Sequence, residues 1–233
     1  MSNFIIERLE QLNDKPHVAF DIETLALGNP SPIIELGAVE FDPFINADVK
    51  RMKKGSFSTG IIITPDECDF IDLNTFKWWM GYDRVQHFYE CTTPGNGYAV
   101  NPTQAIIGLH DWLPNDGDVY LWTNSPKFDA EIYEGFLSRH APDIDPPWHW
   151  SSHLDYRSFQ KFFGDNREYD ADPSLGDYHH AKFDAFIMAR AIQNTVSEIY
   201  RLRATLDPDE VRMRDVKKLV ITDIDEKSDP VVE

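Results

Sequence analysis

The stretch from His17 to Thr24 (HVAFDIET) is the feature that most constrains this chain. Mostly apolar residues lead into Asp21 and Glu23, and residues i and i+2 of an extended strand point to the same face. The sequence therefore predicts a buried strand from whose end two carboxylates project together. Two like charges this close are unfavourable unless a cation lies between them, and hard divalent cations prefer carboxylate oxygens. A strand that ends in a solvated acidic turn is the simpler interpretation, so the case depends on further acids at the ends of other elements.

Length and composition indicate one globular domain. The chain has 233 residues, of which 42% are hydrophobic and 27% charged, enough for one sizeable core. We expect this domain to cover residues 1–205. Residues 206–233, with five acids and only Lys227 as a base beyond Thr222, are predicted to be an acidic tail and not an independent domain.

Charge and cysteine content limit the classes of function. No apolar run approaches membrane-spanning length, and the two cysteines, Cys68 and Cys91, show neither metal-ligand spacing nor a disulfide framework. We therefore expect a soluble, cytoplasmic protein with no membrane partner. The net charge of -18 excludes a protein that coats nucleic acid along its length. It is compatible with an enzyme that holds only a few nucleotides at a metal site.

Periodicity and turn signals predict alternating strands and helices. Strands are expected over 17–24, 33–41, 57–63 and 118–124, the first two as an antiparallel hairpin; helices are expected over 4–12, 74–90, 102–113, 128–137, 180–203 and 208–219. Residues 154–159 are read as a short strand or helix, and 91–102, 142–150 and 161–177 as loops or polar connections.

Two adjacent tryptophans, Trp78 and Trp79, lie in the helix predicted over residues 74–90. Buried aromatic side chains usually serve as core anchors, and this is the simpler interpretation. A functional interpretation places Trp79 under a nucleobase, since stacking on an aromatic ring tolerates any base. The sequence alone leaves both interpretations open.

A third acid, Asp129, follows the apolar strand predicted over residues 118–124, which has the composition of a buried central strand. It would lie in the first turn of the next helix, where an acid also complements the helix dipole. Its position just beyond a strand end matches that of Asp21 and Glu23. We therefore treat Asp129 as a candidate for the same site.

A fourth acid, Asp184, lies in the first turns of the long helix predicted over residues 180–203, directly after two histidines. Residues i and i+4 share a helix face, so helical spacing pairs His180 with Asp184. His179 lies off that face unless it belongs to the loop that enters the helix. A pair of exposed histidines at a helix start is the simpler interpretation, and spacing alone does not choose between the two.

Together these residues resemble a known superfamily. The resemblance is carried by three motifs: Asp21-Ile22-Glu23 near the N-terminus, Phe128-Asp129 after the fourth strand, and His-x-Ala-x-x-Asp from His179 to Asp184. This order resembles the DEDD superfamily of 3′-5′ exonucleases, in its histidine (DEDDh) subgroup. Over about residues 17–200 the chain is most similar to the small group that contains the phage exonuclease DexA and the mycobacterial 3′-5′ exoribonuclease-like domains. The segments 75–79 and 155–157 also resemble that group.

The resemblance implies an RNase H-like α/β fold, with a mixed β-sheet flanked by helices on both faces. It implies two divalent cations, Mg²⁺ or Mn²⁺, held by four acids: Asp21, Glu23, Asp129 and Asp184. It makes His179 the general base and leaves His180 without a role. It places Leu25 against the terminal bases, with Thr24, Asn124 and Phe128 lining the same pocket. Relatives in the family also imply a homodimer.

The expected reaction is hydrolysis at the 3′ end of single-stranded DNA or RNA, which releases nucleoside 5′-monophosphates. Two metals stabilise the attacking and leaving oxygens, and His179 takes a proton from the attacking water. The acidic charge also fits a non-catalytic nucleic-acid mimic or scaffolding protein, although mimicry needs acids spread over a face. Within the enzymes, a proofreading subunit or a small-nucleotide phosphodiesterase is the alternative.

Overall fold

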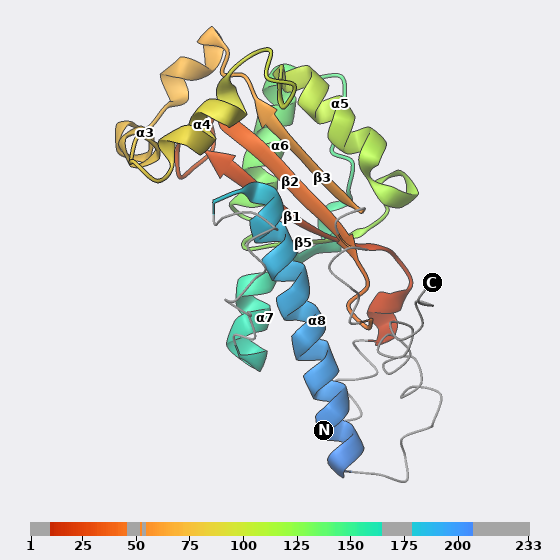
Figure 1. The fold of residues 1–233 in the computed structure, drawn as a ribbon. Coiled ribbons are helices and arrows are strands. Elements are labelled where there is room, and N and C mark those ends of the chain that lie inside the picture. The colour runs from red at the N-terminus through yellow and green to blue at the C-terminus, as the bar shows by residue number, and fades with distance from the viewer. Residues whose placement is uncertain (1–9, 46–51, 53–54, 165–178, 207–233) are drawn as a thin grey trace, which may run out of the picture.

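The computed structural model describes residues 10–45, 52, 55–164 and 179–206 (Figure 1). The helix predicted over 208–219 lies outside these residues, and so do the acidic tail from residue 207 and most of the connection predicted over 161–177. The helix predicted over 4–12 also lies mostly outside them. At its end, Gln11–Asn13 form a short 3₁₀ helix.

A mixed six-stranded sheet forms the centre of the described residues. In chain order its strands are β1 (His17–Thr24), β2 (Ile33–Phe41), β3 (Ser56–Ile61), β4 (Ala99–Val100), β5 (Tyr120–Thr123) and β6 (His153–Asp155). They lie side by side in the order β4-β3-β2-β1-β5-β6. β1 and β2 pair antiparallel, which confirms the predicted hairpin. β5 runs parallel to β1, and β6 runs parallel to β5.

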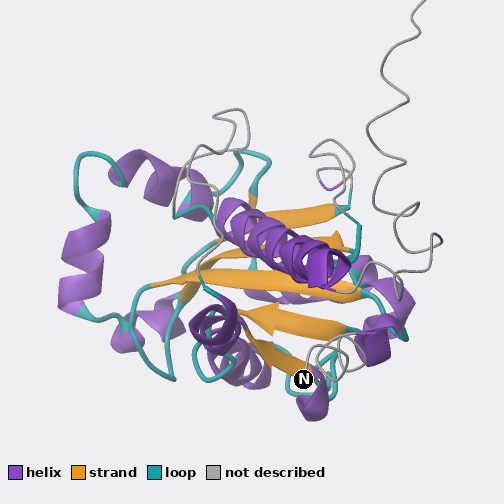
Figure 2. Cartoon of the chain, turned by 90° about the horizontal axis from the view of Figure 1, so that it is seen from below, coloured by secondary structure: helices purple, strands orange, loops and turns teal. Residues whose placement is uncertain are grey.

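Helices cover both faces of this sheet (Figures 1 and 2). They are α3 (Leu73–Trp79), α4 (Val85–Thr92), α5 (Pro102–Trp112), α6 (Asp129–His140), α7 (Tyr156–Phe163) and α8 (Ala181–Leu206). α5 and α6 pack on one face, and α7 and α8 pack on the other. The expected α/β architecture is therefore confirmed. Among the described residues, no helix combines the length and apolar character that crossing a membrane requires.

Strand β1 contributes side chains to both layers of the core, because successive side chains of a strand point to opposite faces of the sheet. Val18, Phe20 and Ile22 belong to the core under α5 and α6, whereas Ala19 belongs to the core under α7 and α8. Asp21 and Glu23 continue the row of Ala19. Both carboxylates therefore point to the face that α8 covers.

Two sequence-based expectations are wrong. The single helix predicted over 74–90 is two helices, α3 and α4, because the chain turns at Gly81, a weak helix former. The Nε–H of Arg84 donates to the carbonyl oxygen of Trp78 at 2.9 Å, which satisfies a carbonyl at the end of α3. The surface loop predicted over 91–102 contains β4, which pairs with the end of β3.

The start of α8 lies directly against β2. Gly37 of β2 pairs with Asp21 of β1. A Cβ atom on Gly37 would lie 2.1 Å from the backbone nitrogen of Lys182, closer than any side chain permits. Glycine at this position therefore brings the first turn of α8 over the acids of β1.

Replacing Gly37 with alanine should lower the free energy of unfolding by about 1–3 kcal/mol, because the new methyl group must displace backbone. Urea denaturation followed by circular dichroism measures this change. Gly108→Ala in α5 is the matched control, since a Cβ there meets the ring of Phe57 at an ordinary 3.5 Å. The control should gain up to about 1 kcal/mol from helix propensity. Unchanged stability of Gly37→Ala would contradict this packing.

Candidate active site

The candidate site lies at the edge of the sheet where β1 and β5 end. Because these strands are parallel, their carboxyl ends meet at the same edge. Asp21 and Glu23 lie at the end of β1 and are half-buried. Asp129, the first residue of α6, follows the end of β5 and is fully buried. The backbone N–H of Ser125 donates to its Oδ2 at 3.0 Å, which fixes the carboxylate at this edge.

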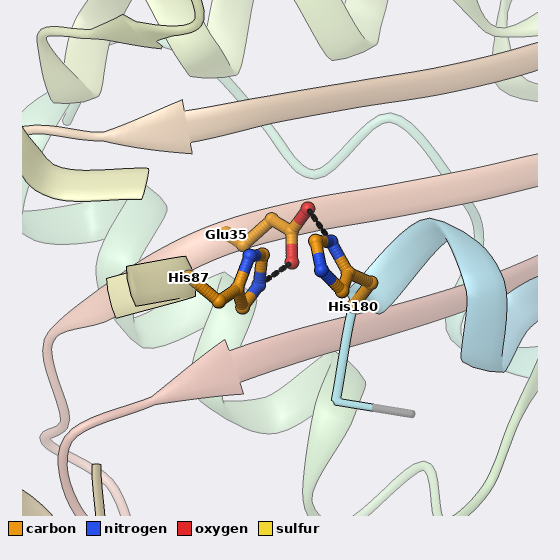
Figure 3. Close-up of side chains that lie close together, drawn as sticks. All are labelled: Glu35, His87 and His180. Carbon is orange, nitrogen blue, oxygen red and sulfur yellow. Dashed lines mark hydrogen bonds and ion pairs between the residues drawn. The ribbon is translucent and has the colours of Figure 1, made fainter. Parts of the chain in front are cut away.

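The turn before α8 sends the side chains of His179 and His180 to different acids. His179 has a φ of 68°, in the left-handed region, and its backbone N–H donates to Oδ2 of Asp184 at 3.1 Å. One ligand atom each from Glu23, His179 and Asp184 lie within 4.8 Å of one another. His180 points instead to Glu35, with its Nδ1 4.0 Å from Oε1 (Figure 3). The turn therefore brings the side chain of His179, and not that of His180, to the carboxylate of Asp184.

One cavity of about 400 Å³ joins these groups. Its lining includes all the residues predicted to be catalytic and two of the predicted substrate contacts: Asp21, Glu23, Asp129, His179, Asp184, Asn124 and Phe128. The four acids come from β1, α6 and α8. Residues far apart in the sequence thus meet in one place.

Burial raises the pKa values of Asp21, Glu23 and Asp129, and repulsion from neighbouring acids adds to the rise for Asp21 and Glu23. Burial raises the pKa of Asp21 well above its usual range, and the charges of Asp129, Glu23 and Asp184 raise it further. The pKa of Glu23 is also well above its usual range, through burial and the charge of Asp184. Burial raises the pKa of Asp129 to about 7. At neutral pH such a group of acids favours uptake of protons or cations, and its carboxylate oxygens are the ligands that Mg²⁺ and Mn²⁺ prefer.

The ring of His179 lies beside Trp78. The two ring centroids are 4.7 Å apart in an edge-to-face contact, and the guanidinium of Arg84 lies 4.1 Å from the centroid of Trp78. Partial burial lowers the pKa of His179, and the charge of Arg84 lowers it further. The neutral imidazole, which accepts a proton, is therefore favoured at neutral pH.

Arg157 is a site residue that the sequence prediction did not assign. It lies in the first turn of α7, is exposed, and lines the cavity. Its positive charge opposes the rise in the pKa of Asp129. The sequence feature that could have identified Arg157 is its position just after a strand. That strand, β6, is parallel to β5 and ends at the same edge of the sheet.

The predicted contacts of Leu25 and Trp79 with bases are contradicted. Leu25 is 0% exposed and Trp79 is 1% exposed, so neither presents a face to a nucleobase. The indole N–H of Trp79 donates to the carbonyl oxygen of Thr24 at 2.9 Å, which makes Trp79 the core anchor of the simpler interpretation. Thr24 is buried as well, and its hydroxyl donates to the carbonyl oxygen of Ala26 at 2.8 Å.

A second hollow of about 740 Å³ adjoins the cavity. The two share three lining residues: Ile22, Glu23 and Phe128. Leu27, which is 80% exposed, and Trp78, which is 39% exposed, also line the second hollow. The predicted contacts Thr24 and Trp79 border it too, but both are buried. The exposed apolar side chains next to the acids are therefore Leu27 and Trp78, each close in sequence to a residue that was predicted instead.

Comparison with known proteins identifies a family and a fold. The model of the family described as the 3′-5′ exoribonuclease Rv2179c-like domain matches residues 16–196. None of the curated proteins matches the sequence. The crystal structure of cell-death related nuclease 4 (CRN-4) aligns with a TM-score of 0.50 at 14% identity, over 79% of this chain and 64% of that chain. This chain therefore spans less than two thirds of CRN-4. The alignment confirms the RNase H-like fold expected from the sequence.

Two other solved structures align with lower scores. The S. pombe Pop2p structure, in a form with bound Mg²⁺ and Mn²⁺, gives a TM-score of 0.47 at 14% identity over 91% of both chains. The nuclease domain of 3′hExo, a DEDDh family member bound to rAMP, gives 0.44 at 13% identity, over 85% of this chain and 95% of that one.

Asp129→Asn should change how stability depends on pH when divalent cations are absent. Because the folded-state pKa is raised to about 7, the stabilising contribution of Asp129 is complete below about pH 4 and is lost as pH rises through about 7. The stability gained by Asp129→Asn over wild type should therefore grow from about pH 5 to about pH 8. The growth between these two pH values is at most about 3 kcal/mol, because about two pH units separate pH 5 from the folded-state pKa of about 7 and each unit is worth about 1.4 kcal/mol.

Urea denaturation in EDTA at both pH values measures this difference. Asp145→Asn, in an exposed loop, is the matched control and should show no such trend. A difference for Asp129→Asn that is the same at both pH values would contradict the raised pKa.

Proposed function

Because the chain belongs to the family of 3′-5′ exoribonuclease Rv2179c-like domains, we propose that it removes nucleotides one at a time from the 3′ end of single-stranded nucleic acid. Each step hydrolyses the last phosphodiester bond and releases a nucleoside 5′-monophosphate. The reaction uses two divalent cations and a histidine general base. The observation that carries the proposal is the meeting of four acids and His179 in one cavity.

The four acids are proposed to hold two Mg²⁺ or Mn²⁺ ions. The raised pKa values of Asp21, Glu23 and Asp129, and the oxygen donors of all four acids, fit hard divalent cations. When bound, such ions stabilise the charge on the attacking and leaving oxygens of an in-line displacement at phosphorus. The hydrogen bond from the backbone N–H of Ser125 to Oδ2 of Asp129 holds one of these carboxylates in place before any ion binds.

His179 is proposed to take the proton from the attacking water. Its lowered pKa keeps the ring neutral at neutral pH. The backbone N–H of His179 donates a hydrogen bond to Asp184, and its ring makes an edge-to-face contact with Trp78. These two contacts hold the ring beside the acids. A positioned base of this kind contributes roughly 10²–10⁴-fold to a rate.

The second hollow is proposed to take the nucleotides that precede the 3′ end. Trp78 offers a partly exposed aromatic ring on which bases stack without regard to sequence, and Leu27 offers exposed apolar surface in the same hollow. Asn124 and Phe128 would then lie beside the terminal nucleotide, and Arg157 supplies a positive charge for its phosphate. Binding of only a few nucleotides is compatible with the net charge of -18, because it needs no extended basic surface.

The family's description as an exoribonuclease favours RNA as the substrate. Discrimination between RNA and DNA depends on contacts to the 2′-hydroxyl. RNA and DNA oligonucleotides of the same sequence, labelled at the 5′ end, should both shorten from the 3′ end if the exonuclease proposal holds. Faster shortening of the RNA would support the ribonuclease assignment, and faster shortening of the DNA would contradict it.

Asp21→Asn should remove nearly all nuclease activity without unfolding the protein, because the amide keeps the volume of the side chain but is a poor ligand for a divalent cation. Shortening of a 5′-labelled RNA with Mg²⁺ or Mn²⁺ measures the activity, and thermal melting reports the fold. Asp145→Asn, in an exposed loop, is the matched control and should stay fully active. Wild-type rates in Asp21→Asn would rule out the proposed metal site.

His179→Ala should slow hydrolysis by roughly 10²–10⁴-fold, the usual range for loss of a general base. His180→Ala should have a much smaller effect, because His180 points to Glu35 (Figure 3) and does not line the cavity that holds the four acids. Single-turnover rates with the same RNA compare the two variants. A larger loss in His180→Ala would show that the base is the wrong histidine.

A further inference from the structure

A second cluster of metal-ligating side chains lies next to the candidate active site. Glu35, which pairs with Glu23 across β1 and β2, is flanked by His87 from α4 and by His180 just before α8 (Figure 3). Oε2 of Glu35 is 3.0 Å from Nε2 of His87, and Oε1 is 4.0 Å from Nδ1 of His180. One ligand atom from each of the three residues lies within 4.8 Å of the other two. Three distant segments thus bring two imidazoles and one carboxylate close together.

The cluster is enclosed on most sides. Glu35 and His87 are buried, and the ring centroids of His87 and His180 are only 3.4 Å apart. The side chain of His180 is 34% exposed, so one side opens to solvent. An ion would therefore enter from the side of His180.

We propose that Glu35, His87 and His180 form a binding site for one divalent transition-metal ion, and that Zn²⁺ fits it best. Two histidines and one glutamate with an open fourth position form a known zinc ligand set. Tetrahedral ligands at zinc distances lie about 3.3–3.4 Å from one another. The separations of 3.0 and 4.0 Å bracket this value. The ring centroids of His87 and His180 are only 3.4 Å apart, so the partly exposed ring of His180 must swing outward for both imidazoles to bind one ion.

Hydrogen bonds from outside the cluster hold the carboxylate in place. Ser58 and Tyr98 donate from their hydroxyls to Oε1 of Glu35, and the backbone N–H of Ala181 donates to Oε2 at 2.9 Å. Metal-ligating carboxylates are usually oriented by such outer partners. An ion between Glu35 and His87 would replace only the hydrogen bond between those two residues.

The cluster differs chemically from the proposed catalytic site. Imidazole nitrogens favour Zn²⁺, whereas the carboxylates of the catalytic site favour Mg²⁺ and Mn²⁺. Cys91 lies one helical turn after His87, with its Sγ 3.4 Å from Nε2, but it is not among the three residues that converge. We assign Cys91 as a neighbour and not as a ligand. An ion here would join α4 and the start of α8 to β2.

The test measures Zn²⁺ binding to the full chain with Asp21→Asn and Asp184→Asn, so that binding at the catalytic acids is suppressed. After treatment with EDTA and dialysis, calorimetry and native mass spectrometry should show one Zn²⁺ per chain, and Zn²⁺ should raise the melting temperature. Adding His180→Asn should weaken binding more than about 100-fold, since even outer-shell changes weaken metal sites 10–100-fold. These readouts use no nuclease activity, so the result is independent of the proposed function.

His149→Asn in the same double variant is the matched control, because His149 is exposed and lies outside the cluster. It should bind Zn²⁺ like the double variant itself. Absence of Zn²⁺ binding in the double variant, or equal binding after His180→Asn, would overturn the proposal. If His180→Asn disturbs the fold, the absorption of Co²⁺ bound to the double variant decides: a tetrahedral spectrum from nitrogen and oxygen ligands is expected. A thiolate-to-cobalt band, or no tetrahedral band, would overturn the assignment.

Discussion

Repulsion among four carboxylates at one sheet edge is the interaction on which the rest of the structure depends. Burial raises the pKa values of Asp21, Glu23 and Asp129, and the charges of neighbouring acids raise those of Asp21 and Glu23 further. A fold holds such groups together only when other contacts fix the segments that carry them. Here β1 presents Asp21 and Glu23, the backbone of Ser125 fixes Asp129, and the start of α8 supplies Asp184. A nucleic-acid mimic would gain nothing from concentrating its acids in this way.

Strand β2 supplies the contacts that hold α8 over these acids. Gly37 permits the close approach of the helix, and Glu35 accepts the backbone N–H of Ala181. Glu35 pairs with Glu23 across the two strands, yet their pKa values shift in opposite directions. Burial alone would raise the pKa of Glu35, but hydrogen bonds from His87 and others lower it below its usual range. Local hydrogen bonding, and not position in the sheet, decides which acid stays charged.

Sequence patterns predicted the elements that position the acids, because alternation in β1 and the strand-to-helix step before Asp129 are local properties. The patterns did not choose between His179 and His180, since that choice depends on one left-handed residue before α8. The resemblance to a family made the choice, and the structure brings His179 to Asp184. Leu25 was wrongly placed in the pocket because its burial arises from tertiary packing that no local pattern contains.

The account rests on the capacity of one cavity to bind two divalent cations. Crystals of the protein soaked in Mn²⁺, with data collected at the manganese absorption edge, test this most directly. We predict two anomalous peaks among the carboxylates of Asp21, Glu23, Asp129 and Asp184. Saturating Mn²⁺ without an anomalous peak in that cavity would contradict the account.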